Sequence, residues 1–294
     1  MRDHRSRISR PTGRSFGLHF ASGEGAGWKA RVRLNLAHYS MGFLELYPPD
    51  RVELRGSGTL VRVGKTYGVL TAAHVWRVVS KLREVGIYLY PPRKLEIHAI
   101  TEDPRVMDAV SFENDKDDEF GPDIAFIRLR ESKAASIEKY ATFLNLDGHL
   151  QKAAEGPPEN SKAMDAVAGG VYELGQKENV FENRRLILQN SLLHVGHAMY
   201  IDDGRNGFDR LEFTPDLGPE FVPPSSYGGM SGGGCFRVYF PSSGDGEPEP
   251  ITFHLLGVAF YETKVDGKPD KLICHGPLSV HEKLVPAIHQ KWND

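Results

Sequence analysis

The stretch PSSYGGMSGGGCFRV, residues 224–238, places Ser231 inside a run of glycines. Glycine costs conformational entropy in a packed segment, so a cluster of glycines indicates backbone geometry that side chains would obstruct. A flexible linker is one interpretation, because linkers are often rich in glycine and serine. The other is a turn that presents a nucleophilic serine while backbone N–H groups converge where negative charge develops. This second interpretation requires a base and an orienting carboxylate elsewhere in the chain.

The composition is that of an ordinary globular protein. The chain has 294 residues, of which 40% are hydrophobic and 26% are charged. This length fits two domains of about 150 residues or one two-lobed unit. A net charge of -3 gives no argument for binding nucleic acid, and no apolar run approaches the roughly 18 residues that a membrane span needs. We therefore expect neither a nucleic-acid partner nor a membrane partner.

Cysteine usage and the N-terminus bear on the location of the protein. The two cysteines, Cys235 and Cys274, lie in apolar, strand-like surroundings and are interpreted as buried thiols, not as a disulfide framework. A reducing cytoplasm is the expected compartment. The first residues are rich in arginine but lack the apolar core of a secretory signal. We interpret residues 1–30 as a flexible arm, with a docking or targeting segment as the alternative.

Short strand-like runs between turn signals recur along the chain and predict an all-β protein. The clearest is a hairpin, in which the runs 58–63 and 66–75 flank a two-residue turn. A polar stretch at 151–162 divides the chain near its middle, with strand-like runs on both sides. We therefore expect two β-lobes, residues 31–145 and residues 146–294.

The end of the chain has a helical pattern. The segment SVHE at 279–282 has the spacing of a capping box. Leu284, Ile288 and Trp292 then repeat every four residues, as a helical packing stripe would. Pro286 interrupts this pattern, so we expect a helix that is short or kinked there.

Two residues fit as partners of Ser231. A serine hydroxyl is a poor nucleophile until a base takes its proton, and histidine is the usual base. Among the twelve histidines, His74 stands out because it ends the strand-like run GVLTAAH, which would hold its imidazole at a rigid edge. Asp123 directly precedes the apolar run IAFIRL and is the best candidate for the carboxylate that fixes the tautomer of the imidazole. An aspartate before a strand is usually only a turn residue, so this assignment depends on all three residues occurring together.

The segments TAAH at His74, DIAFIRL at Asp123 and GMSGG at Ser231 resemble the three signature blocks of the trypsin-like serine peptidase family, in that family's order. In the absence of disulfides the chain is most similar to bacterial or intracellular members. The resemblance implies two antiparallel six-stranded β-barrels with the active site in the cleft between them, and a short C-terminal helix packed on the second barrel. It also implies a serine endopeptidase that acts on proteins or peptides through an acyl-enzyme and needs no metal or cofactor.

The same resemblance assigns roles to the glycine-rich stretch. The N–H groups of Gly229 and Ser231 are expected to form the oxyanion hole, where Gly229 must lack a side chain so that the substrate oxygen can come close. In the digestive members an aspartate precedes the nucleophile and receives a new N-terminus after zymogen cleavage. Here that position is Met230, so activation by that route is not expected.

Substrate binding is assigned by resemblance to Ser225, Phe260, Tyr261 and Glu262. By this resemblance Ser225 is expected to form the floor of the specificity pocket, and a neutral floor favours apolar or small side chains at the cleaved residue. Strand alternation places Glu262 toward the pocket wall if Phe260, which stands where the family often has a serine, faces the triad. A carboxylate there predicts a modest preference for lysine or arginine at the cleaved residue.

Alternative functions remain open at this point. A catalytically inactive binding or scaffold protein could retain the fold, and an esterase could use the same three residues. A metal site at His194-x-x-His197 is a further alternative, although no glutamate falls between the two histidines. An active cytoplasmic peptidase would also need control, so a regulatory protein partner is expected.

Overall fold

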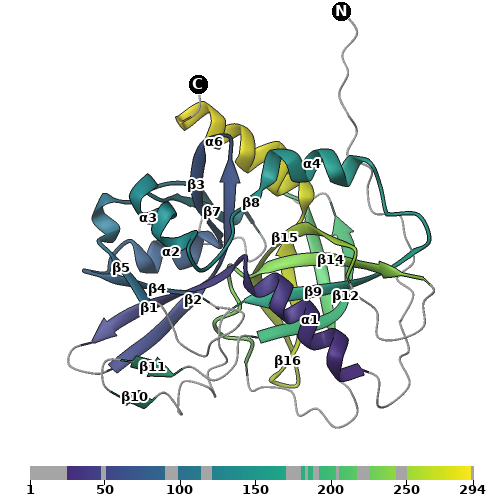
Figure 1. Cartoon of the computed structure of the whole chain (residues 1–294), viewed down its shortest axis with the longest axis horizontal. Helices are drawn as coiled ribbons and strands as arrows, with labels where there is room; N and C mark the ends of the chain where they lie inside the picture. Colours follow the sequence, from purple (N-terminus) through teal and green to yellow (C-terminus); the bar gives the residue numbers. More distant parts are fainter. Residues whose placement is uncertain are drawn as a thin grey trace, which may run out of the picture.

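The computed structural model describes residues 25–47, 51–89, 99–113, 121–169, 180–182, 185–187, 192–202, 205–216, 226–242 and 250–292. These residues form a mostly β structure with two large antiparallel sheets, one in each half of the chain (Figure 1). The expectation of an all-β fold with two lobes and a short C-terminal helix is confirmed. Ser225, the expected pocket floor, lies outside the described residues.

The first lobe contains most of the elements of the first half of the chain. They are β1 (Ser40–Tyr47), β2 (Arg51–Val63), β3 (Thr66–Thr71), α2 (Ala73–Val79), β4 (Val85–Leu89), β5 (Ala99–Glu102), η1 (Pro104–Val106), β6 (Asp108–Glu113), β7 (Asp123–Arg128), α3 (Glu131–Ile137) and β8 (Leu144–Asn145). The sheet order is β5-β4-β1-β2-β3-β7-β6, and β8 pairs in parallel with β2. In the described residues this lobe is thus a path of seven antiparallel strands, where the resemblance implied a closed barrel of six.

The central strands of the first lobe form from the most apolar runs. The expected hairpin is present as β2 and β3, and the turn between them uses Gly64 at a positive φ of 56°. The residues Ile124 to Ile127 of β7 are fully buried, because β7 lies between β3 and β6 and is covered on both faces. The run 66–75 does not remain extended to its end. β3 stops at Thr71 and helix α2 begins at Ala73, since the two alanines that follow favour a helix.

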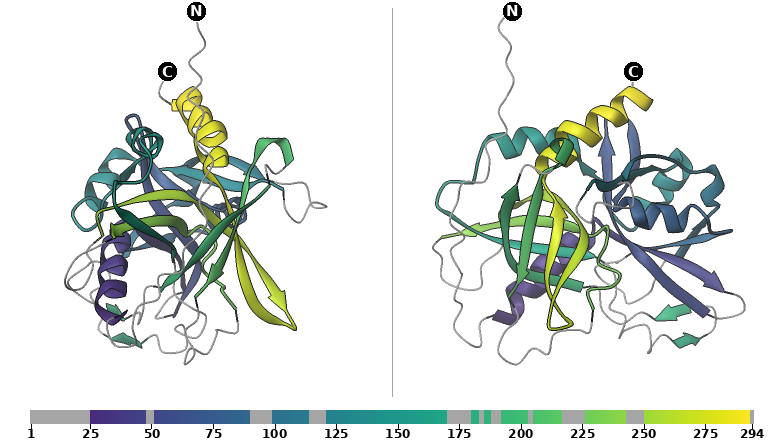
Figure 2. Two further views of the ribbon diagram at one scale, coloured as in Figure 1. Left: turned by 90° about the vertical axis from the view of Figure 1, so that its right-hand side faces the viewer. Right: turned by 180° about the vertical axis from the view of Figure 1, so that it is seen from behind.

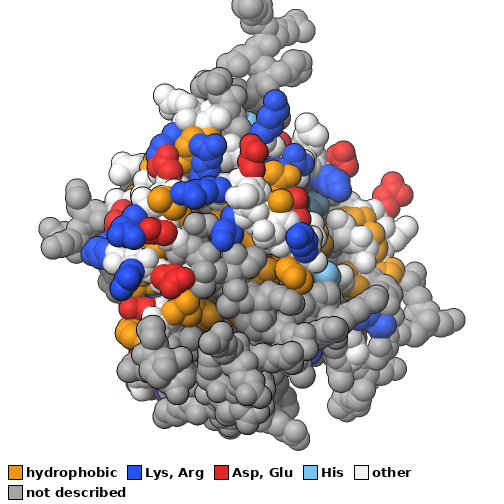
Figure 3. Space-filling view, turned by 60° about the vertical axis from the view of Figure 1, so that its left-hand side comes forward, with side chains coloured by type: hydrophobic (Ala, Val, Ile, Leu, Met, Phe, Trp, Pro, Cys, Tyr) orange, Lys and Arg blue, Asp and Glu red, His pale blue; other side chains and the backbone are white. Residues whose placement is uncertain are grey.

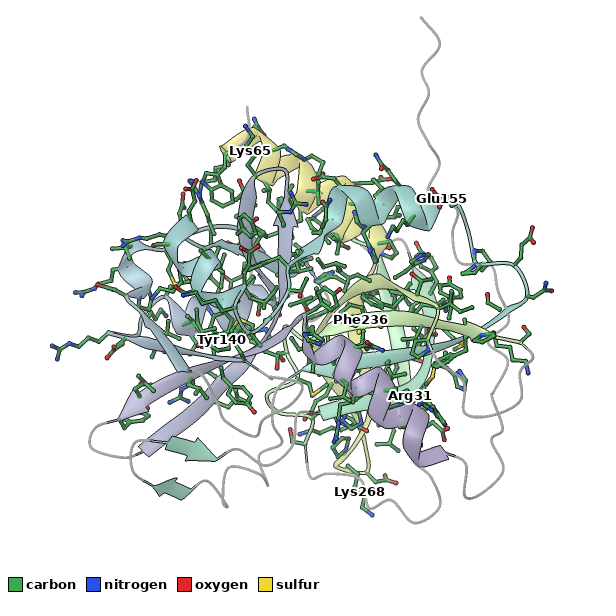
Figure 4. All side chains as sticks on the ribbon, viewed as in Figure 1. Arg31, Lys65, Tyr140, Glu155, Phe236 and Lys268 are labelled. Carbon is green, nitrogen blue, oxygen red and sulfur yellow. The ribbon has the colours of Figure 1, made fainter. Side chains whose placement is uncertain are left out.

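The second lobe is a closed barrel of six strands in the order β12-β13-β16-β15-β14-β9. Its elements are α4 (Leu146–Ala154), β9 (Ser161–Gly169), β12 (Leu192–Asp202), η2 (Arg205–Gly207), β13 (Arg210–Pro215), β14 (Gly234–Pro241), β15 (Thr252–Val265) and β16 (Lys268–His275), with a separate hairpin of β10 (Val180–Glu182) and β11 (Arg185–Ile187). Strand β9 pairs with both β12 and β14 and so closes the ring. Phe236, labelled in Figure 4, is fully buried in the core of this lobe.

Helix α1 (Gly25–Ala37) corrects the expected N-terminal arm. The sequence assigned residues 1–30 to a flexible segment, but from Gly25 onward the chain is helical, and only 1–24 lie outside the described residues. Trp28 is 3% exposed and packs edge-on against Phe240 of β14, with ring centroids 5.9 Å apart. Burial of the large tryptophan ring stabilises the packing of α1 on the second lobe, although the residues around Trp28 are polar. The chain then enters the first lobe.

The C-terminal helix α6 (Val285–Trp292) follows a π-helical turn, η3 (Ser279–Leu284), and Pro286 lies in its first turn, where proline is tolerated. The resemblance implied packing on the second barrel. Its end instead packs on the first lobe, where Trp292 lies 5.7 Å from the ring of Phe126 and Lys291 forms an ion pair with Asp108. Figure 1 shows α6 crossing the top of the molecule beside α4. Val285 and Ile288 of the helix belong to a core cluster with residues of both lobes.

The surface gives few further signals. The end of the β15–β16 hairpin, with its turn at Asp266-Gly267, extends beyond the barrel in both views of Figure 2. On the face shown in Figure 3, the described basic and acidic side chains are interspersed and do not gather into a patch of one sign. Within the described part of the chain, no helix is long and apolar enough to cross a membrane.

Candidate active site

The structure brings His74 and Asp123 into direct contact. His74 lies in the first turn of α2, and Asp123 is the first residue of β7. One carboxylate oxygen of Asp123 accepts a hydrogen bond from the His74 backbone N–H at 2.8 Å, and the other lies 2.6 Å from His74 Nδ1. Two bonds to the same residue fix both the backbone and the ring of His74. They leave Nε2 as the ring nitrogen available to exchange a proton.

Asp123 is held in its charged form. Its side chain is 19% exposed, and that of His74 is 33% exposed. Burial alone would raise the pKa of Asp123, but the hydrogen bonds and the charge of His74 more than compensate, and the net effect is a lowered pKa. Asp123 therefore remains a carboxylate that can stabilise a positive charge on His74.

A histidine of the second lobe binds the backbone of Asp123. The backbone N–H of Asp123 donates to Nε2 of His275, the last residue of β16, at 2.9 Å. The His275 ring stacks on Phe260 with centroids 4.3 Å apart and an interplanar angle of 16°. Burial lowers the pKa of His275 to about 4, so the ring is neutral and can accept this bond at neutral pH. Phe260 thus contacts the ring that binds the backbone of Asp123.

The turn that carries Ser231 is shaped by backbone hydrogen bonds. The Ser231 carbonyl accepts from the N–H of Ser57 in the first lobe at 2.8 Å. The N–H of Gly232 donates to the carbonyl of Ala259 at 2.7 Å, and the N–H of Gly233 donates to that of Met230 at 2.8 Å. Met230 is fully buried in an apolar cluster and so anchors the turn by its side chain.

Two of the glycines in this turn are needed for their geometry. Gly229 and Gly232 have φ of 88° and 90°, a region that other residues rarely adopt. A Cβ at Gly232 would lie 2.0 Å from the carbonyl oxygen of Ser57 and 2.2 Å from the hydroxyl of Thr71. The bare backbone therefore allows the turn to approach the first lobe. Among the described residues, the N–H groups of Gly229 and Ser231 have no hydrogen-bond acceptor, which leaves both available to a ligand.

Ser231 lies at the same junction as the His74–Asp123 pair, but no hydrogen bond between the described atoms joins its hydroxyl to His74. Thr71 and Ser57, which border the turn, belong to β3 and β2, and a Cβ at Gly56 would touch Val75 beside His74. Such bonds are often absent in substrate-free structures and form when substrate binds. The turn of Ser231 and the His74–Asp123 pair thus lie at the same junction of the two lobes, and no hydrogen bond between the described atoms links their side chains.

Glu262 bridges two segments of the second lobe. Both of its oxygens lie 3.1 Å from the Ser226 hydroxyl, and one accepts from the N–H of Tyr227 at 2.5 Å. Lys264 forms an ion pair with Glu262 at 3.0 Å. The carboxylate that was expected to attract basic substrates is thus bound to three neighbouring residues. Tyr261, which the resemblance assigned to substrate binding, is partly buried against the core of the first lobe.

The histidines of the alternative metal site do not converge. His194 and His197 are three residues apart in β12, so their side chains point to opposite faces of the strand. His194 is buried, its ring lies 5.0 Å from that of Tyr227, and burial lowers its pKa to about 4. Among the described residues, no cluster of His, Cys, Asp and Glu could hold a metal ion.

Two residues of the site were missed by sequence reasoning. Ser57 lies in the segment GSGTL, where a second small cluster of glycines was a signal comparable to that around Ser231. His275, in the run KLICHG, carried no such signal, because a single histidine at the end of a strand has no pattern of its own.

Comparisons with known proteins add little to this picture. Neither the protein-family models nor the curated proteins gave a match. Among solved structures, one similar chain is a serine-to-alanine mutant of Rv3671c from M. tuberculosis H37Rv, in an inactive form. The two chains are 14% identical, and the match covers 93% of this chain and 98% of that one with a TM-score of 0.44. A similarity at this level carries no argument about function, so the roles of residues rest on the geometry above.

Proposed function

We propose that this protein is a serine endopeptidase in which Ser231 is the nucleophile, His74 the general base and Asp123 the group that orients His74. The observation that carries the proposal is the pair of hydrogen bonds from His74 to Asp123, at 2.8 Å from the backbone N–H and 2.6 Å from the ring. A carboxylate in this position fixes the imidazole tautomer that can accept a proton at Nε2. The position of the Ser231 turn at the same junction supports the same assignment.

The proposed reaction is acyl transfer to Ser231 followed by hydrolysis. His74 Nε2 takes the proton of the Ser231 hydroxyl while the oxygen attacks a peptide carbonyl carbon. Asp123 stabilises the resulting imidazolium, which then protonates the departing amine and leaves an acyl-enzyme. Water attacks this ester, again with His74 as the base, and the carboxylic acid product leaves Ser231 free.

The glycine-rich turn supplies electrostatic stabilisation in this proposal. When the carbonyl is attacked, negative charge develops on its oxygen, and the N–H groups of Gly229 and Ser231 donate hydrogen bonds to it. Both N–H groups lack an acceptor in the described structure, so binding the oxyanion costs no existing bond. Removal of one such donor in a related mechanism costs about 100- to 1,000-fold in kcat.

The test compares the wild-type protein with Ser231→Ala on two substrates, fluorescently labelled casein and a small activated ester. We expect wild type to cleave both and Ser231→Ala to cleave neither, with both proteins folded by circular dichroism. Hydrolysis of the ester without any cleavage of casein would favour an esterase. If wild type cleaves neither substrate, a catalytically inactive binding protein becomes the better account.

A further inference from the structure

Ser57 donates two hydrogen bonds from the first lobe to the turn that carries Ser231. Its N–H donates to the carbonyl oxygen of Ser231 at 2.8 Å, and its hydroxyl donates to the carbonyl oxygen of Gly229. Gly229 and Ser231 are also the two residues whose N–H groups form the proposed oxyanion hole. A single, fully buried residue therefore binds the carbonyls of both.

The position of Ser57 is fixed from within the first lobe. In the pairing of β1 with β2, Phe43 lies opposite Gly56 and Leu44 opposite Leu54, so Arg55 is an extra residue in β2. A bulge of this kind bends a strand and re-aims the residues beside it. The carbonyl of Ser57 also accepts a hydrogen bond from the Thr71 hydroxyl at 2.7 Å. Both polar backbone groups of Ser57 and its hydroxyl are thus engaged.

The hydroxyl of Ser57 binds a peptide group that would otherwise be held at its N–H end only. Gly229 has no side chain to restrict its rotation, and its φ of 88° is one of several that glycine adopts at little cost. The peptide between Gly229 and Met230 is held at both ends, because Met230 N–H donates to the Tyr227 carbonyl at 3.0 Å while Ser57 binds the Gly229 carbonyl. The side chain of Met230 is uncharged, so it cannot anchor this part of the turn by an ion pair.

We propose that Ser57 is a positioning residue that holds the carbonyls of Gly229 and Ser231 toward the first lobe and so fixes the backbone conformation of the turn, which keeps the N–H groups of the same two residues aligned on the oxyanion. The inference rests on the proposed function of Ser231. In this proposal a side chain of the first lobe controls an oxyanion hole whose two N–H donors both belong to the second lobe. The N–H of Ser57 contributes whatever its side chain is, so the hydroxyl is the part that substitution can remove.

The experiment measures kcat and KM of Ser57→Ala on a small ester, together with the affinity for a peptide aldehyde, whose adduct with Ser231 places an oxygen in the hole. We expect kcat to fall about 10- to 100-fold, less than on loss of a donor itself, with KM within about twofold. Aldehyde affinity should fall by a similar factor. The matched control is Ser40→Ala, since Ser40 is 2% exposed and its hydroxyl donates to the Leu36 carbonyl at 3.0 Å, away from the turn.

The possible results distinguish the positioning role of Ser57 from the proposed peptidase function. If Ser57→Ala keeps a wild-type kcat, changes only KM, or loses no more kcat than Ser40→Ala, the positioning role is overturned while the peptidase proposal stands. If wild type itself shows no turnover that depends on Ser231, the proposed function fails and the positioning role fails with it. Loss of kcat and of aldehyde affinity in Ser57→Ala alone supports the inference.

Discussion

The two sides of the candidate site are held by different kinds of contact. On the first lobe, a side chain holds a side chain, because the Asp123 carboxylate binds both the backbone and the ring of His74. On the second lobe, the turn of Ser231 is held by backbone hydrogen bonds to carbonyl groups, and its glycines allow it to lie close to the first lobe. Substitutions in the His74–Asp123 pair should therefore lower activity by removing a chemical group. Substitutions of the glycines in the Ser231 turn should lower stability by adding a side chain that clashes with the first lobe.

The largest expected effect comes from the side-chain pair. Asp123→Asn should lower kcat by about 10,000-fold, because the amide can no longer fix the tautomer of His74, and His74→Ala should lose at least as much. Both variants should keep a wild-type midpoint of urea unfolding to within a small margin, since the pair is partly exposed. Measured kcat values close to wild type in either purified variant would show that another base serves Ser231.

The glycine turn is tested by adding one methyl group. Gly232→Ala should lower the free energy of unfolding by about 3 kcal/mol or more, because its Cβ would lie within 2.2 Å of both the Ser57 carbonyl and the Thr71 hydroxyl. Activity should be lost as well, since the turn and the first lobe must separate.

Gly156→Ala is the matched control for that substitution. Gly156 also has a positive φ, of 85°, but a Cβ there meets nothing within 4 Å. Backbone strain alone should then cost about 1 kcal/mol. Equal losses of unfolding free energy in the two variants would mean that strain, and not the contact between lobes, explains the effect at Gly232.

Acid should weaken the second half of the chain first. Burial lowers the pKa of His149 to about 3 and those of His194, His275 and His281 to about 4. An unfolded histidine binds a proton near pH 6.5, so below that pH the unfolded state takes up more protons and stability falls until about pH 4. Each histidine contributes up to about 1.4 kcal/mol per pH unit. Asp209 acts in the opposite direction, because burial raises its pKa.

Urea unfolding at pH 5, 6, 7 and 8 measures this dependence. The free energy of unfolding should be nearly level between pH 7 and 8 and several kcal/mol lower at pH 5. A curve that is flat from pH 8 to pH 5 would show that these histidines are not buried in their neutral form.

The smallest effect is expected at Glu262. Its carboxylate already binds Ser226, Tyr227 and Lys264, so Glu262→Gln should change the relative kcat/KM for matched peptides ending in Arg, Leu and Ala by less than about threefold. The sequence alone predicted a preference for basic residues that this substitution removes. A loss of tenfold or more for the arginine peptide alone would restore that view and place the carboxylate in contact with substrate.

The sequence predicts those strands and turns that depend on residues close together in the chain. The β2–β3 hairpin follows from an apolar run on each side of a glycine turn, and the strand after Asp123 follows from IAFIRL. The end of β3 was placed too late, because TAAH looks extended although its alanines begin a helix. The contacts of Ser57 and His275 depend on how the two lobes meet, and no spacing within the chain encodes that. The sequence motifs could therefore be recognised from the chain alone, but the contacts that Ser57 and His275 make with the candidate site could not.

Activation of Ser231 by His74 and Asp123 is tested most directly by the rate and site of labelling with a fluorophosphonate probe, followed by peptide mass spectrometry. We expect a single adduct, on Ser231, that is absent in Ser231→Ala and forms at least about 1,000-fold more slowly in His74→Ala. Wild-type protein that remains unlabelled, or a His74→Ala variant labelled as fast as wild type, would contradict it.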